Sequence, residues 1–94
     1  MIEFEEYKGK LNSLKPTLDG LREALHLEPA EKEIEELEGQ SARDGFWNDV
    51  ENSQRVQKRL KQLKGKVENY QKLCSGWDDL MTLCEMAIEE DDDS

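Results

Sequence analysis

The chain has 94 residues, of which 35% are hydrophobic, 6% aromatic and 38% charged, and its formal net charge is −10. This length limits it to one domain, and so few apolar residues favour helices packed along narrow stripes over a compact globular core. The acidic total argues against binding of nucleic acid over the whole surface.

Targeting and redox features point to the cytoplasm. The acidic N-terminus lacks the apolar region of a signal peptide, and no apolar run approaches the ~20 residues of a transmembrane helix, so no membrane partner is expected. Cys74 and Cys84 fall on one predicted helix, roughly 15 Å apart, which is too far for an intrachain disulfide. A chain without a disulfide framework fits a reducing compartment.

The first predicted helix covers about residues 2–25. Its apolar residues recur in alternating steps of three and four, which places them on one stripe: Phe4, Tyr7, Leu11, Leu14, Leu18, Leu21 and Leu25. Pro16 interrupts this pattern, because a proline inside a helix removes a hydrogen bond and clashes with the preceding turn. We therefore expect the helix to be kinked or split near Pro16.

A short second helix is predicted over about residues 29–39. Pro29 suits its first turn, where the missing N–H costs nothing, and Gly39 favours a stop. Residues 39–48 have no periodicity and should form a loop. Phe46 and Trp47 in this loop are predicted to be structural anchors on the core, with contact to a partner as the alternative.

The third helix, over about residues 49–89, dominates the chain. Asn48 or Asp49 should cap it, and its apolar residues keep a strict seven-residue repeat that includes Tyr70 and Trp77 as structural anchors in the core. The acidic end, EEDDDS, should fray or stop the helix. The fold class is therefore all-α, an antiparallel helical hairpin or bundle with coiled-coil-like packing. The stripe from Trp77 to Ile88 still needs partners, so the chain looks like a fragment of something longer, and a homodimer of the isolated fragment is possible.

Charge is distributed in blocks along the chain. Residues 28–51 hold nine acidic and two basic residues, and residues 55–72 hold seven basic residues and one acidic residue. Arg55, Lys58, Lys61 and Lys72 should lie away from the apolar stripe, where they could contact RNA phosphates, whereas Arg59, Lys64 and Lys66 lie beside the stripe. We expect the second group to pair with the acidic helix at residues 31–38.

Residue patterns that support catalysis do not occur in the sequence. It has no Gly-rich phosphate loop, no HExxH, no CxxC and no nucleophile elbow, and its single histidine, His26, is isolated. The sequence therefore predicts no catalytic, cofactor-binding or metal site, and no enzyme.

The stretch LREALHLEPAEKEIEELEGQSARDGFWNDVENSQRVQKRLKQLKGKVENYQKL resembles the N-terminal domain of the bacterial peptide chain release factor 2 family. The most specific part is the acidic helix EKEIEELE followed by the loop and FWND, with a Lys/Arg-rich helix after them, and the resemblance runs along essentially the whole chain.

The resemblance implies that residues 1–94 are the truncated N-terminal helical domain of a factor that reads UGA and UAA stop codons. In that family this domain reaches the base of the ribosomal stalk, so the implied partners are ribosomal protein, rRNA and the remaining domains of the factor. The codon-reading and GGQ catalytic motifs belong to those remaining domains. Two other hypotheses are a self-associating coiled-coil adaptor unrelated to translation and a helical arm that grips tRNA.

Overall fold

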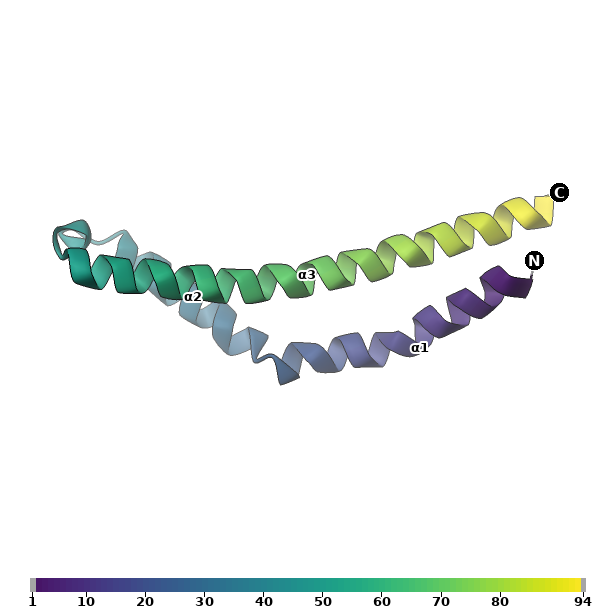
Figure 1. Ribbon diagram of the computed structural model, residues 1–94, viewed down its shortest axis with the longest axis horizontal. Coiled ribbons are helices and arrows are strands. Elements are labelled where there is room, and N and C mark those ends of the chain that lie inside the picture. Colours follow the sequence, from purple (N-terminus) through teal and green to yellow (C-terminus); the bar gives the residue numbers. More distant parts are fainter. Residues whose placement is uncertain (1, 94) are drawn as a thin grey trace. The chain divides into compact units, whose positions relative to one another are not determined.

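The computed structural model describes the backbone of residues 2–93 and the side chains of residues 3–91, and its ordered elements are all helical (Figure 1). They are α1 (Ile2–Ala24), α2 (Leu27–Ser41), the short 3-10 helix η1 (Phe46–Asn48) and α3 (Val50–Asp93). No strand occurs in this described part of the chain, which confirms the all-α class.

The residues form two compact units, and α1 and α3 each run through both. One unit joins the beginning of α1, through residue 21, to the end of α3, from residue 71 onward, and we call it the terminal unit. The other spans residues 22–70 and contains α2, the loop, η1 and the first half of α3; we call it the central unit.

Helix α1 is continuous through Pro16, so it is not split there. A proline lacks one N–H, but the turns on either side keep their own hydrogen bonds, and the loss of one bond does not end a helix of 23 residues. The helix ends at Ala24, just before the corner at Leu25 and His26.

Helix α2 begins after a tight corner at His26. This residue adopts a left-handed conformation with φ 55°, its N–H donates to the Glu23 carbonyl at 3.0 Å, and its carbonyl accepts from the Ala30 N–H at 3.1 Å. Pro29 lies in the first turn, where a missing N–H is tolerated. The helix passes Gly39 and ends at Ser41, whose hydroxyl donates to the Leu37 carbonyl at 2.9 Å.

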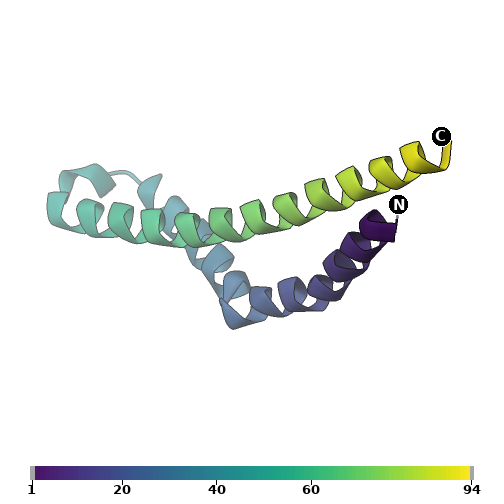
Figure 2. The same cartoon turned by 45° about the vertical axis from the view of Figure 1, so that its right-hand side comes forward.

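The connection between α2 and α3 reverses the chain direction (Figures 1 and 2). Gly45 has φ 82°, a backbone conformation that favours glycine, and its carbonyl accepts from the Asn48 N–H at 3.1 Å within η1. Asp49 then caps α3, since its Oδ1 accepts from the Asn52 N–H at 3.1 Å.

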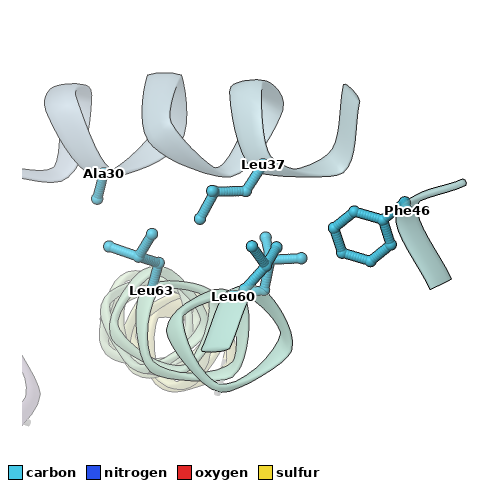
Figure 3. Packing of buried hydrophobic residues seen from close by; sticks show 6 residues of the cluster. Ala30, Leu37, Phe46, Leu60 and Leu63 are labelled. Carbon is cyan, nitrogen blue, oxygen red and sulfur yellow. The ribbon is translucent and has the colours of Figure 1, made fainter. Parts of the chain in front are cut away.

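The core of the central unit lies between α2, η1 and the first half of α3 (Figure 3). Its cluster consists of Ala30, Leu37, Phe46, Val56, Leu60 and Leu63. In Figure 3, Ala30 and Leu37 point from α2 toward Leu60 and Leu63, and Phe46 closes one end against Leu60. Full burial of each leucine or valine contributes ~1.5–3 kcal/mol, so these contacts hold α2 and α3 together as a hairpin.

The terminal unit is held by fewer buried groups. The Trp77 indole N–H donates to the Leu11 carbonyl at 2.6 Å, and the Lys15 ammonium lies 5.0 Å from the Trp77 ring centroid. Leu80 and Leu83 remain 52% and 61% exposed. In this unit α3 continues through the acidic run to Asp93, past the stop expected near residue 89, because carboxylates near a helix C-terminus cost only ~0.3–1 kcal/mol each.

Candidate functional site

The outward face of α3 in the central unit carries three of the four basic residues predicted to contact a partner. Arg55, Lys58 and Lys61 are all exposed, and their spacing of three residues places them on one side of the helix. The other side carries the buried residues Val56 and Leu60. Arg55 donates to the Asn52 side-chain oxygen at 2.8 Å, whereas Lys58 and Lys61 form no ion pair with any side chain that the structure describes. We call these three residues the basic face.

Lys72, the fourth candidate, belongs to the terminal unit. It is exposed and lines a hollow there together with Leu73 and Trp77. Its surroundings are therefore apolar, unlike those of the basic face.

The basic residues beside the apolar stripe have partners within the central unit. Arg59 donates two hydrogen bonds to the Glu33 carboxylate, at 2.7 and 3.0 Å, and Lys64 lies 3.7 Å from the Glu38 carboxylate. Pairing of these two residues with the acidic helix α2 is therefore confirmed. Lys66 differs from the prediction, because its ammonium donates to the Leu25 carbonyl at 2.7 Å instead of to an acidic side chain.

The Arg59–Glu33 pair shifts both titrations. The hydrogen bonds from Arg59 lower the pKa of Glu33 below its usual value, and Glu33 in turn raises the pKa of Arg59. Both groups therefore stay charged at neutral pH, so Glu33 compensates the positive charge of Arg59. A partner would meet the uncompensated charge of the basic face instead.

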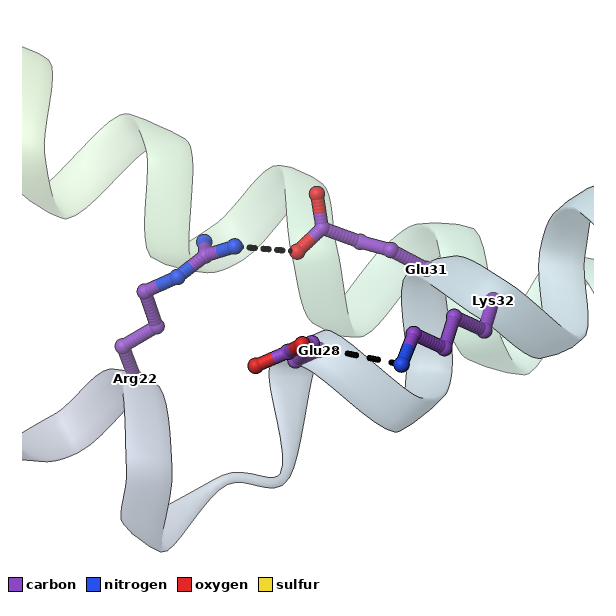
Figure 4. Close-up of polar contacts among 4 residues, drawn as sticks. All are labelled: Arg22, Glu28, Glu31 and Lys32. Atoms are coloured by element: carbon purple, nitrogen blue, oxygen red, sulfur yellow. Dashed lines mark hydrogen bonds and ion pairs between the residues drawn. The ribbon is translucent and has the colours of Figure 1, made fainter.

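One ion pair joins α1 to α2 across their corner, and a second lies within the first turns of α2 (Figure 4). Arg22 at the end of α1 donates to the Glu31 carboxylate at 2.5 Å, and Lys32 lies 3.6 Å from the Glu28 carboxylate within α2. Exposed pairs of this kind contribute ~0.2–1 kcal/mol each, so they add little to the free energy of unfolding.

The four predicted structural anchors do not all lie in the core. Phe46 is 8% exposed and Tyr70 is 9% exposed, and Trp77 is half-buried with its hydrogen bond to Leu11. Trp47 is 60% exposed, and its ring meets Phe46 edge to face at a centroid distance of 5.0 Å. Only one of two adjacent aromatics can point into this core, and the sequence has no periodicity in the loop to indicate which.

An apolar hollow lies open on the terminal unit. Its lining residues include Phe4, Tyr7, Leu14, Leu80, Leu83 and Cys84. Most of these side chains are apolar, so the hollow is suited to bind another apolar surface.

The described residues include no cluster of three or more side chains suited to hold a metal ion. Within the same residues, none of the helices combines the length and the apolar character that crossing a membrane requires.

Comparison with known proteins gives a consistent family. Residues 30–94 match the PCRF domain. The chain is 39% identical over 83 residues to peptide chain release factor 2 from Acidothermus cellulolyticus. The aligned region covers 88% of this chain and 22% of that protein. It is 33% identical over 94 residues to peptide chain release factor 2 from Clostridium perfringens, which covers 100% of this chain and 26% of that protein.

The protein of the same name from Petrotoga mobilis is 30% identical over 96 residues, covering 100% of this chain and 25% of the relative. The chain thus spans about a quarter of the length of these curated relatives. No solved structure matches it. Among the three hypotheses drawn from the sequence, these relatives favour the release factor.

Proposed function

The chain belongs to the PCRF domain family, and the relatives similar to it are peptide chain release factors. From this membership we propose that it acts in translation termination. It serves as the N-terminal helical domain of a class I factor for the UGA and UAA stop codons and docks that factor at the base of the ribosomal stalk. Its place of action is the cytoplasm, and its partners are the ribosome and the remaining domains of the factor.

The basic face is the observation that carries the docking proposal. Its three residues lie exposed on α3, while the neighbouring Arg59 and Lys64 are paired with Glu33 and Glu38. Clustered Lys and Arg side chains release counterions when they meet nucleic-acid phosphates, which favours rRNA as the group that this face contacts. The net charge of −10 argues against binding of nucleic acid over the whole surface, which favours contact through a limited basic region.

The chain acts as a binding module in this proposal. Its 94 residues contain no GGQ sequence, so the hydrolysis of peptidyl-tRNA falls to another part of the factor. What the module contributes is orientation, because a docked domain raises the effective concentration of the domains linked to it.

A charge-reversal experiment tests this proposal. The Lys58→Glu, Lys61→Glu double variant should bind purified 70S ribosomes more weakly than the unchanged chain in a pelleting assay, and the difference should shrink as salt is raised. A matched control with the same change in charge is Lys10→Glu, Lys32→Glu, which alters two exposed lysines outside the basic face. Equal weakening by both variants, or no weakening by either, would remove the basic face from the mechanism.

A further inference from the structure

Trp47 exposes a large apolar surface at the end of the central unit where α2 connects to α3. The side chain is 60% exposed, and Val50, three residues later, is 61% exposed. Tryptophan is the residue type most enriched among those that carry the binding energy of protein interfaces. We call residues 43–51, which contain both side chains, the tip.

The backbone of the tip is held in a defined conformation. The Phe46 N–H donates to the Arg43 carbonyl at 3.2 Å, the Asn48 N–H donates to the Gly45 carbonyl at 3.1 Å, and Asp49 caps α3. Phe46 is buried in the core, and its ring supports the edge-to-face contact with Trp47, with an interplanar angle of 84°. A preorganised aromatic side chain loses little conformational entropy on binding, so the exposed ring is well suited to anchor a partner.

The charges around Trp47 indicate whether its partner is a protein or a nucleic acid. The tip carries Asp44, Asp49 and Glu51 against a single base, Arg43, and all four side chains are exposed. A surface with this excess of acidic groups repels phosphate, which argues against an RNA base stacked on the ring. It complements a protein surface that has an apolar pocket with basic residues around it.

We propose that Trp47 anchors the tip in an apolar, basic-rimmed pocket of a ribosomal protein, while the basic face contacts rRNA. This inference rests on the proposed function, and it divides that docking surface into a protein-binding part and an RNA-binding part. The two parts predict different responses to salt, because the apolar contribution of the Trp47 ring is insensitive to ionic strength, whereas phosphate contact weakens as salt is raised.

Site-specific photocrosslinking tests this inference directly. The 94-residue chain carrying benzoylphenylalanine at position 47 is bound to purified 70S ribosomes and irradiated, and the product is digested with either ribonuclease or protease. The adduct should survive ribonuclease and disappear with protease, and mass spectrometry should assign it to a ribosomal protein. The same probe at position 35, an exposed site on α2, is the control and should give little adduct.

Binding of two variants gives a second measurement. Trp47→Ala should weaken ribosome binding about ten- to thirty-fold at both low and high salt, and Trp47→Phe should retain most of the affinity. Because the side chain is largely exposed, Trp47→Ala should lower the free energy of unfolding only by the lost contact with Phe46, and Trp47→Phe by less.

The outcomes separate this inference from the function on which it rests. An adduct to rRNA alone, no adduct at position 47, or unchanged binding of Trp47→Ala overturns the role of Trp47 while the chain still binds ribosomes. A chain that does not bind ribosomes at all overturns the proposed function together with this inference.

Discussion

Replacing Leu63 by alanine should destabilise the central unit more than any comparable change in the terminal unit. Leu63 is 4% exposed and packs in the cluster with Ala30, Leu37 and Leu60. Truncation of a buried leucine removes its transfer free energy and leaves a cavity, which together cost ~2–5 kcal/mol. The cluster is formed by only two helices and one short turn, so the side chains around the cavity can move partly into it. We therefore expect a loss of about 2–3 kcal/mol in the free energy of unfolding.

Urea unfolding followed by circular dichroism at a low protein concentration measures this loss as a lower midpoint with an unchanged slope. The matched control is Leu83→Ala, since Leu83 is 61% exposed and should shift the free energy of unfolding by only about 0.5 kcal/mol or less. If Leu63→Ala leaves too little folded protein to measure, Leu63→Val provides a milder variant of the same site. Equal losses for the Leu63 and Leu83 variants would refute the assignment of the core.

Two further predictions concern charge and self-association. The pKa of Glu33 is lowered by its hydrogen bonds from Arg59, so the stabilising effect of this pair is complete above the ordinary carboxyl pKa and is lost as pH falls through the folded-state value. The stability difference between the unchanged chain and Glu33→Gln should therefore shrink in strong acid in pH-dependent urea titrations, and a constant difference would contradict the pair. Because Leu80 and Leu83 line an open apolar hollow, we expect the isolated chain to form homodimers, and Leu80→Glu with Leu83→Glu should give monomers. Sedimentation equilibrium measures this change, and an unchanged chain that stays monomeric at every concentration would contradict it.

Periodic features were the ones that the sequence could predict. The steps of three and four residues in the first and third helices indicated helical stripes, and the offset between acidic and basic blocks indicated the pairing of Arg59 and Lys64 with α2. The stripes are a local property, because a helix fixes which residues share a face. The pairing joins two helices, and it could be predicted because a hairpin brings the acidic block beside the basic one. These features were enough to establish the fold class.

Features that depend on tertiary geometry could not be read in the same way. Trp47 and Phe46 are neighbours of similar character, and only the conformation of the loop decides that Phe46 enters the core. Lys66 was expected beside an acid, but the corner at Leu25 brings a backbone carbonyl to it instead. In each case the deciding contact joins residues that do not belong to one repeating pattern of apolar or charged residues, so the sequence does not predict it.

The continuity of α3 has a consequence for how the molecule folds. A helix is costly to nucleate and inexpensive to extend, and α3 has no boundary between residues 50 and 93. The first half of α3 is stabilised by the cluster around Leu60 and Leu63, whereas the leucines of the second half are mostly half-exposed. Because extension adds one hydrogen bond for each residue that becomes ordered, continuity with the well-packed first half lowers the free-energy cost of keeping the second half helical.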